Sequence, residues 1–387
     1  MKDNRVGVGI VGAGSIGIRG ALNHLVLPDA QERVRIAAIC DPVIGRAEAA
    51  AEKYGASAGY LTYEELLADD GVDVVTLCSP IGLHHDQGMA AIAAGKHVHF
   101  NKTMCTTLDE ANDLIDAAQA RGVKLVASPG VMAHPHAQRM RRAVLEERLG
   151  QLIWAMAGSS GVAAYHLNEK LRQGDDILSN IDPSWYYKRP GGGPLFDSTV
   201  YSMHYLTGIV GPAKAVTAMS GLAIPVREFR GRQIECEMDD NTFMLLDFGQ
   251  AFYAVGFGTP HGVLQRGAEP YIYGTQGAIL QAALGEQSLR RDDDAAPFVT
   301  PEHRALGESH VYSDLMQLVD WASGGPRPFG TAEHARHVIE IFDAAYRSSA
   351  SGQTQTLQST FEPVPLERLA ALVRSLDSYR AYYERWS

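Results

Sequence analysis

The stretch VGVGIVGAGSIGIRGALNHLVL, residues 6–27, decides the fold of the first part of the chain. It joins a short apolar run, Val6–Val11, to a helical pattern, Gly17–Leu27, through a glycine-rich turn. Glycines spaced as GxGxxG between a first strand and a first helix let the backbone turn tightly, approach a pyrophosphate and pack helix against strand. Unpaired amides at the helix start then bind the anion. We therefore predict a dinucleotide site whose contacts include Gly12, Gly14, Ser15, Ile16 and Gly17.

The first third of the chain continues this alternation of short apolar runs and helical patterns. Such an alternation is typical of a parallel sheet with helices on both faces. It predicts a Rossmann-type α/β domain over residues 1–128. The further expected strands are Val34–Cys40, Val74–Cys78, Lys96–Phe100 and Val123–Ala127, and the expected helices are Ile44–Tyr54, Tyr63–Ala68, His85–Ala94 and Leu108–Arg121.

The pattern changes after Ser128, where β-like runs begin to follow one another without helices between them. This predicts an α+β domain with a mostly antiparallel sheet over residues 129–387. The expected strands are Leu152–Ala157, Ala215–Ser220, Phe243–Phe248, Phe252–Gly256 and Tyr271–Tyr273. The expected helices are His136–Arg148, Ser313–Ala322, Ala332–Ser348 and an added C-terminal helix, Leu366–Trp386.

Composition excludes several classes of protein. The chain has 387 residues, 45% of them hydrophobic, and 34 Lys and Arg against 45 Asp and Glu, which gives a net charge of -11. An acidic surface repels phosphate backbones and anionic lipids, so we expect neither nucleic acid nor membrane as a partner. The apolar run at residues 6–11 is too short for a signal peptide, and no run is long enough for a membrane span. Four separated cysteines (Cys40, Cys78, Cys105 and Cys236) favour a reducing, cytoplasmic compartment.

The second strand ends at Cys40-Asp41-Pro42, where an acidic side chain bears on cofactor choice. An acid at this point accepts hydrogen bonds from both ribose hydroxyls of NAD and repels the 2′-phosphate of NADP. We therefore expect NAD rather than NADP. Arg46, a basic residue a little further along the chain, keeps NADP as the alternative cofactor. The alternative interpretation is an ordinary glycine turn followed by an aspartate that caps a helix.

These motifs resemble the glucose–fructose oxidoreductase and inositol dehydrogenase family, Gfo/Idh/MocA. The resemblance implies a Rossmann domain joined to an open-faced sheet domain that makes dimers or tetramers. It also implies cofactor contacts from Ser79, Pro80, His84, Asn101 and Lys102. The segments that carry it are GIVGAGSIG (9–17), ICDP (39–42), SPIGLHHD (79–86), HVHFNKTM (97–104), GGGPLFDSTVYSMHYLTG (191–208) and YGTQGAI (273–279).

Two segments depart from the family pattern. The usual Glu-Lys-Pro reads Asn101-Lys102-Thr103, which keeps the lysine and loses both neighbours. The aspartate–glycine–histidine pattern on the substrate-domain helix reads Asp197-Ser198-Thr199-Val200-Tyr201, with tyrosine where many members have histidine. This is similar to the branch containing glucose–fructose oxidoreductase and dihydrodiol dehydrogenase, in which a tyrosine takes the proton-transfer role.

The residues themselves suggest how such a tyrosine could act. Asp197, Tyr201 and His204 are spaced i, i+4 and i+7, so an α-helix would place them on one face. A tyrosine titrates near pH ~10 and needs a nearby ammonium, for which Lys102 is the candidate. We predict Lys102 and Tyr201 as the proton-transfer pair, Asp197 as the residue that orients a substrate hydroxyl or the lysine, and His204 as a binding residue or alternative base. A helix-start acid, a core tyrosine and a packing histidine are the structural alternatives.

Further candidates lie on either side of this helix. Trp185, Tyr187, Lys188 and Arg189 precede the glycine turn at 191–193, and aromatic and basic side chains suit the faces and anionic groups of sugars. A surface loop that packs on a neighbouring subunit explains the same composition. His134 is expected near the cleft at the start of the second domain. The histidines lack an HExxH context or a cysteine pair, so we expect no metal.

Three functions fit this sequence. The first is an NAD(P)-dependent dehydrogenase or reductase acting on a secondary hydroxyl of a sugar, cyclitol or glycoside. The second is a glycoside-cleaving enzyme that oxidises, eliminates and reduces with bound NAD. The third is a non-catalytic NAD(H)-binding regulator. In each case we expect a small carbohydrate-like ligand and a homo-oligomer.

Overall fold

The computed structural model describes residues 5–161, 167, 170–366 and 369. Its first layer is a six-stranded parallel sheet in the order β3-β2-β1-β4-β5-β6, which confirms the predicted Rossmann-type sheet. The short edge strand β3 was not predicted, because three residues are too few to show a pattern. The strands are β1 (Val6–Val11), β2 (Val34–Cys40), β3 (Ala58–Tyr60), β4 (Val74–Leu77), β5 (His97–Phe100) and β6 (Leu125–Ala127).

Capping residues set the ends of several helices in this part of the chain. Thr62 and Thr107 each form a capping box with a glutamate three residues later, and Gly122 ends its helix in the left-handed region at φ 71°. The predicted helix Gly17–Leu27 is instead a π turn followed by one short α turn. The elements are η1 (Gly17–Leu22), α1 (Asn23–Leu25), α2 (Pro28–Gln31), α3 (Arg46–Tyr54), α4 (Tyr63–Ala68), η2 (Ile81–Leu83), α5 (His84–Ala93) and α6 (Leu108–Arg121).

The second sheet has nine strands in the order β16-β15-β14-β13-β7-β12-β11-β8-β17. It is mostly antiparallel, as predicted, and β7 and β12 pair in parallel. A separate hairpin pairs β9 (Val226–Phe229) with β10 (Arg232–Glu235). The strands are β7 (Leu152–Ser160), β8 (Ala215–Gly221), β11 (Asn241–Gly249), β12 (Phe252–Thr259), β13 (Tyr271–Gly274), β14 (Ala278–Leu280), β15 (Ala283–Leu284), β16 (Gln287–Ser288) and β17 (Gln355–Thr356).

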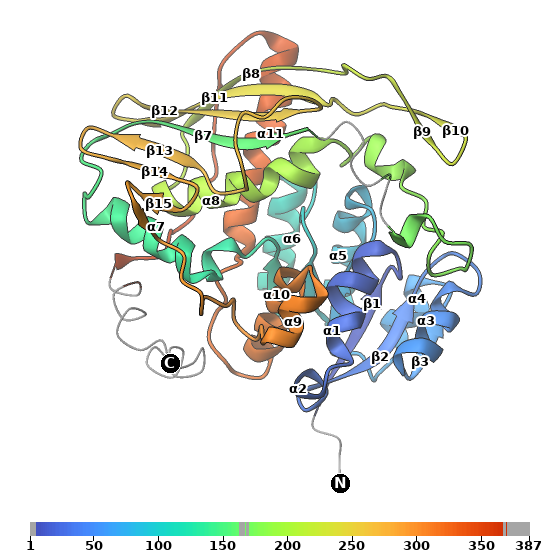
Figure 1. Cartoon of the computed structure of the whole chain (residues 1–387). Helices are drawn as coiled ribbons and strands as arrows, with labels where there is room; N and C mark the ends of the chain where they lie inside the picture. Colours follow the sequence, from blue (N-terminus) through green and yellow to red (C-terminus); the bar gives the residue numbers. More distant parts are fainter. Residues whose placement is uncertain (1–4, 162–166, 168–169, 367–368, 370–387) are drawn as a thin grey trace.

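One face of this sheet is covered and the other is open. Helices α8 and α11 pack beneath it, and side chains such as Met244 and Leu246 are buried against them (Figure 1). On the opposite face Met219 is 81% exposed and Leu245 is 52% exposed. The helices of this part are η3 (Val131–Ala133), α7 (Pro135–Leu145), η4 (Lys170–Arg172), η5 (Ser184–Tyr187), η6 (Leu195–Thr199), α8 (Val200–Val210), α9 (Pro301–Leu306), α10 (Ser309–Ala322) and α11 (Ala332–Ser351).

Helix α10 connects the two parts of the molecule. It comes from residues assigned by sequence to the second domain, yet it packs on η1 and on strands β5 and β6 of the first sheet. Its buried side chains Leu315 and Met316 share a hydrophobic cluster with Ile10 and Val126. The first sheet is therefore completed by a helix that follows it by about half the chain. The C-terminal helix predicted at Leu366–Trp386 falls almost wholly outside the described residues.

Two further findings concern the chain as a whole. All four cysteines are buried and unpaired. Among the described helices, none combines the length and apolar character that crossing a membrane requires. The cytoplasmic compartment stays a prediction.

Candidate active site

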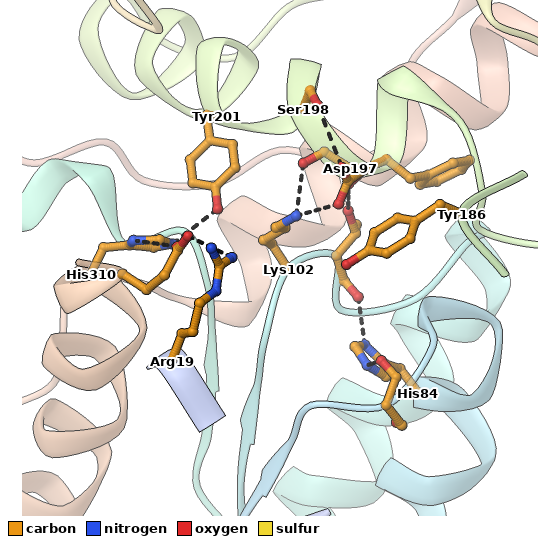
Figure 2. Close-up of polar contacts among 12 residues, drawn as sticks. Arg19, His84, Lys102, Tyr186, Asp197, Ser198, Tyr201 and His310 are labelled. Atoms are coloured by element: carbon orange, nitrogen blue, oxygen red, sulfur yellow. Dashed lines mark hydrogen bonds and ion pairs between the residues drawn. The ribbon is translucent and has the colours of Figure 1, made fainter. Parts of the chain in front are cut away.

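The candidate site forms where the carboxyl end of the first sheet meets the second part of the chain. Lys102 follows β5, Asp197 lies in η6, and Tyr201 lies in the first turn of α8. Figure 2 shows Lys102 between Asp197 and Tyr201, with Arg19 and His310 beyond the tyrosine hydroxyl. Ligands of open α/β sheets bind at this edge.

Lys102 is held by Asp197 in a buried ion pair. Its ammonium donates to the Asp197 carboxylate and, at 2.9 Å, to the Asp197 carbonyl oxygen. The two side chains are 11% and 2% exposed. Burial lowers the pKa of Lys102, but the Asp197 carboxylate, with Tyr186 and Glu308, raises it, and the net shift is upward. A second link, from the Thr103 hydroxyl to the Phe196 carbonyl oxygen at 2.6 Å, fixes the two segments together. Lys102 is therefore a fixed cation.

Tyr201 is a phenol with a neutral partner. Its hydroxyl lies 2.9 Å from Nε2 of His310, and the Lys102 ammonium lies 5.5 Å from its ring centroid. Burial, together with the carboxylates of Glu308 and Asp197, raises the pKa of Tyr201 well above its ordinary value. Burial followed by the charge of Lys102 lowers the pKa of His310 to about 3. At neutral pH the hydroxyl therefore keeps its proton, and the hydrogen bond joins a neutral phenol to a neutral imidazole.

The helix that carries Asp197 and Tyr201 is not a regular α-helix. Residues Leu195–Thr199 form a π turn, so the α-helical spacing used to align His204 with them does not hold through this segment. His204 is 2% exposed and its ring lies 4.6 Å from that of His334 on α11. Burial lowers the pKa of His204 to about 3. The structure gathers Asp197 and Tyr201 around Lys102 and places His204 against α11.

The glycine turn has the shape that a pyrophosphate needs. A side chain on Gly12, whose φ is 98°, would meet the Cys78 carbonyl oxygen at 2.9 Å, and one on Gly17 would meet the Gly12 carbonyl oxygen at 2.0 Å. A side chain on Gly14 would approach only Ile181, at 3.9 Å. Gly12 and Gly17 are therefore required by packing, whereas the space at Gly14 suits a ligand. Ser15 is buried in this turn, beside half-buried Ile16.

Asp41, which directly follows β2, contacts the glycine turn. Its carboxylate accepts the amides of Ala13 and Val43, each at 3.0 Å, and lies 3.5 Å from the guanidinium of Arg46. An acid and a base therefore both lie at the end of β2, beside the glycine turn.

Residues after β4 and β5 complete the expected cofactor wall. The ring nitrogens of buried His84 lie 2.8 Å from the Thr103 carbonyl oxygen and 3.0 Å from that of Ser79, and burial lowers its pKa to about 4. Ser79 and Pro80 are half-buried at the same edge. The Oδ1 atom of Asn101 is buried without a hydrogen-bond partner among the described residues. An orphaned acceptor and an open glycine fit a nicotinamide dinucleotide here.

The aromatic stretch before the glycine turn is mostly engaged in local packing. Tyr187 is fully buried and lies under the guanidinium of Arg227. Trp185 stacks on Tyr186, with ring centroids 3.8 Å apart. Lys188 pairs with a carboxylate on the segment after β10 at 2.7 Å, and Arg189 pairs with another at 2.8 Å.

His134 directly precedes α7, and its ring centroid lies 5.5 Å from that of His136. Burial, with the neighbouring His136 and His310, lowers the pKa of His134 to about 3. It is therefore a neutral ring near the tyrosine partner. The described residues hold no cluster of three or more metal-binding side chains.

Two family profiles match the chain. "Oxidoreductase family, NAD-binding Rossmann fold" (GFO_IDH_MocA) matches residues 6–128, and "Oxidoreductase family, C-terminal alpha/beta domain" matches residues 162–357. The chain belongs to the Gfo/Idh/MocA oxidoreductases. The resemblance of its motifs is thereby confirmed, as is the paired Rossmann and sheet architecture.

Individual relatives agree with this assignment. The 1,5-anhydro-D-fructose reductase of Ensifer adhaerens is 29% identical over 332 residues, which cover 81% of this chain and 88% of that protein. A glycosyl hydrolase family 109 protein of Shewanella is 38% identical over 127 residues, but these cover only 30% of this chain and 27% of that protein. The WlbA dehydrogenase of Bordetella pertussis, solved with NADH and UDP-GlcNAcA, superposes with a TM-score of 0.69 at 19% identity, covering 92% of this chain and 99% of that one.

Several residues around the site were not singled out from the sequence. Arg19 lies on η1. Its place directly after the glycine turn is the one feature of the sequence that could have indicated a role. His310 and Glu308 lie at the start of α10, a helix predicted to begin only at Ser313. Tyr186 lies beside the Lys102–Asp197 pair (Figure 2). Side chains brought together from such distant segments leave no local pattern in the sequence.

Proposed function

We propose that this oxidoreductase transfers hydride between a nicotinamide cofactor and a secondary hydroxyl of a sugar, cyclitol or glycoside. The observation that carries the proposal is the Lys102–Asp197 pair beside Tyr201, at the sheet edge where the glycine turn leaves room for a dinucleotide. A fixed ammonium and a phenol at one point suit the loss of a carbinol proton.

The chain's own residues divide the work as follows. Gly14 and the neighbouring amides would hold the pyrophosphate, while Asn101 and His84 would border the nicotinamide, which accepts hydride when bound. Lys102 would donate a hydrogen bond to the carbinol oxygen and stabilise negative charge as it develops there. Asp197 keeps that ammonium charged and aimed, and Tyr201 receives the hydroxyl proton.

The test uses the full-length protein with a panel of sugars, cyclitols and glycosides and added NAD. We expect NADH absorbance with at least one compound and its loss in Tyr201→Phe, while NAD binding persists in the variant. NAD binding without turnover of any compound by the parent protein would favour the regulator instead.

Glycoside cleavage is the second candidate, because 127 residues of this chain are 38% identical to a glycosyl hydrolase family 109 protein of Shewanella. It would use the same residues with bound NAD acting in a closed cycle. Consumption of a glycoside with no net NADH, and NAD(H) released on denaturing the purified protein, would establish this function in place of the first.

We propose NAD as the preferred cofactor. Two backbone amides fix the Asp41 side chain beside the glycine turn, where it would meet the ribose and disfavour a 2′-phosphate. Arg46 offsets part of that charge. We expect kcat/KM to favour NAD and Asp41→Ser to shift the ratio towards NADP; an unchanged ratio would show that Asp41 does not face the ribose.

We also propose that the protein self-associates through the outer face of the nine-stranded sheet. Apolar side chains there, including Leu245 and Tyr253, are about half exposed, at 52% and 46%. Such a face is typical of an interface. Light scattering should give a dimer or tetramer, and Leu245→Lys should lower its mass to that of a monomer.

A further inference from the structure

Tyr201 presents a chemical problem that the Lys102–Asp197 pair does not solve. A phenol whose pKa is raised can accept a substrate proton only if it gives up its own at the same time. Lys102 is already charged and bonded to Asp197, so it cannot take that proton. The partner must therefore be the group that faces the tyrosine hydroxyl.

We propose that His310 is this group, and that Tyr201, His310 and Glu308 form a relay that carries the carbinol proton out of the site. The inference rests on the proposed hydride-transfer function and adds residues to its mechanism. The hydroxyl of Tyr201 lies 2.9 Å from Nε2 of His310, and Nδ1 of the same ring lies 3.7 Å from a carboxylate oxygen of Glu308. The relay requires the tautomer with hydrogen on Nδ1, on the side of Glu308, and a free lone pair at Nε2. An acidic group beside a histidine that serves a hydroxyl is the order found in catalytic triads.

The backbone of Glu308 adopts a strained conformation. It precedes α10 with φ 51°, in the left-handed region that a side chain seldom adopts. Its other carboxylate oxygen accepts from Arg19 at 3.0 Å, and Arg19 belongs to η1, directly after the dinucleotide turn. Glu308 is 28% exposed at its side chain, so solvent reaches the outer end of the relay.

The proton balance is simple. When the carbinol C–H leaves as hydride, the carbinol O–H bond breaks and its proton binds the Tyr201 oxygen. The former Tyr201 proton moves to Nε2 of His310, and the Nδ1 proton passes to the Glu308 carboxylate and on to solvent. One proton is released for each hydride transferred, and the carbinol carbon becomes a carbonyl. Exchange of the His310 ring protons with solvent then restores hydrogen on Nδ1 before the next turnover.

The surroundings of His310 favour passing a proton on rather than storing it. Burial and the ammonium of Lys102 lower its pKa, so the imidazolium is short-lived. The titratable and charged groups that face it or act on it from neighbouring elements are Tyr201, Glu308, Lys102, Arg19, His24, His99 and His134.

A first experiment needs no substrate. NMR of nitrogen-labelled histidines in the full-length protein reports which ring nitrogen of His310 carries hydrogen. We expect hydrogen on Nδ1 and a shift of the Nε2 signal in Tyr201→Phe. Hydrogen on Nε2 would overturn the relay whatever the enzyme's activity, and would leave the proposed function standing.

A second experiment measures turnover with NAD and the best substrate of the panel. His310→Gln should lower kcat roughly 10²-fold, with cofactor affinity near that of the parent, because glutamine cannot pass a proton on. The residual rate should rise with pH as hydroxide takes the tyrosine proton. His85→Gln on α5 is the matched control: its ring faces Asp86 and Asp113 and should leave turnover unchanged.

Imidazole rescue separates a proton carrier from a structural residue. His310→Ala should regain turnover when imidazole is added, and substituted imidazoles should rescue in the order of their basicity. A low rate that imidazole does not restore, with an unaltered pH profile, would show that His310 only supports the fold. Absence of NAD-linked turnover in the parent protein would instead refute the proposed function, and the NMR result would still decide the relay geometry.

Discussion

The glycine turn and the Lys102–Tyr201 junction are built in opposite ways. The turn uses six consecutive residues whose backbone must adopt one shape. The junction joins Lys102 to Asp197 across 95 positions, Tyr201 to His310 across 109, and Arg19 to Glu308 across 289. A backbone requirement leaves a mark in the local sequence, whereas a cluster of distant side chains depends on the whole fold. Substitutions in the two regions should therefore fail in different ways.

The largest effect is expected at Lys102. Lys102→Met removes the fixed ammonium and should lower kcat by roughly 10²–10⁴-fold. It also leaves the Asp197 carboxylate buried without the Lys102 ammonium, which should lower the free energy of unfolding by about 3–5 kcal/mol. Denaturant unfolding and steady-state kinetics measure the two effects.

The double variant Lys102→Met/Asp197→Asn serves as the control, because it removes both charges. Stability should largely return while turnover does not. A stable Lys102→Met protein would show that the pair is not buried as described.

Asp314 tests how α10 is joined to the first part of the chain. Its carboxylate accepts the Ser128 hydroxyl at 2.6 Å and the Gly130 amide at 2.9 Å, and burial raises its pKa from 3.8 to about 6. The folded state therefore binds more protons than the unfolded state between these values, and stability falls as pH rises through them. The difference corresponds to about 3 kcal/mol. Between pH 4 and pH 7 the free energy of unfolding of the parent should fall by about this amount relative to that of Asp314→Asn, because the buried histidines act equally on both proteins; parallel curves would contradict it.

Gly14→Ala and Gly17→Ala should separate binding from folding within the turn. A methyl group at Gly17 meets backbone 2.0 Å away and should destabilise the protein by about 1–3 kcal/mol. At Gly14 the methyl group has space, so stability should hold while NAD affinity falls roughly tenfold, a change of about 1.4 kcal/mol. Thermal unfolding and NAD titration distinguish them. Equal loss of stability in both variants would remove the distinction.

His204 should show the smallest effect on turnover. Because it packs on His334, His204→Leu should keep kcat within about threefold of the parent. Burial lowers its pKa to about 3, so the unfolded state takes a proton first as pH falls below its ordinary value, and the parent loses stability on acidification. The His204→Leu variant should lose less stability than the parent on acidification. A kcat loss as large as that of Tyr201→Phe would restore His204 as a candidate base.

The sequence sufficed for features that repeat or that the backbone imposes. Apolar runs such as Val6–Val11 and the helical spacing of Leu108–Arg121 predicted strands and helices close to those observed. It did not reveal the π turn at Leu195–Thr199, because nothing in that stretch distinguishes a five-residue turn from an α turn. His310 escaped notice because its helix begins four residues before the apolar pattern does. Lys102, Asp197 and Tyr201 were found through the family resemblance, while their contacts required the fold.

The position of α10 in the chain also governs the order in which the protein can be made. The first sheet ends with β6 near residue 127, yet the helix that covers β5 and β6 ends at Ala322. At ordinary synthesis rates of roughly 5–20 residues per second, the ribosome needs roughly 10–40 s to bridge that interval. Throughout it the nascent sheet presents the apolar side chains that Leu315 and Met316 later bury. Translation speed and chaperone supply, more than the stability of the finished molecule, should therefore set the yield of this protein in a foreign host.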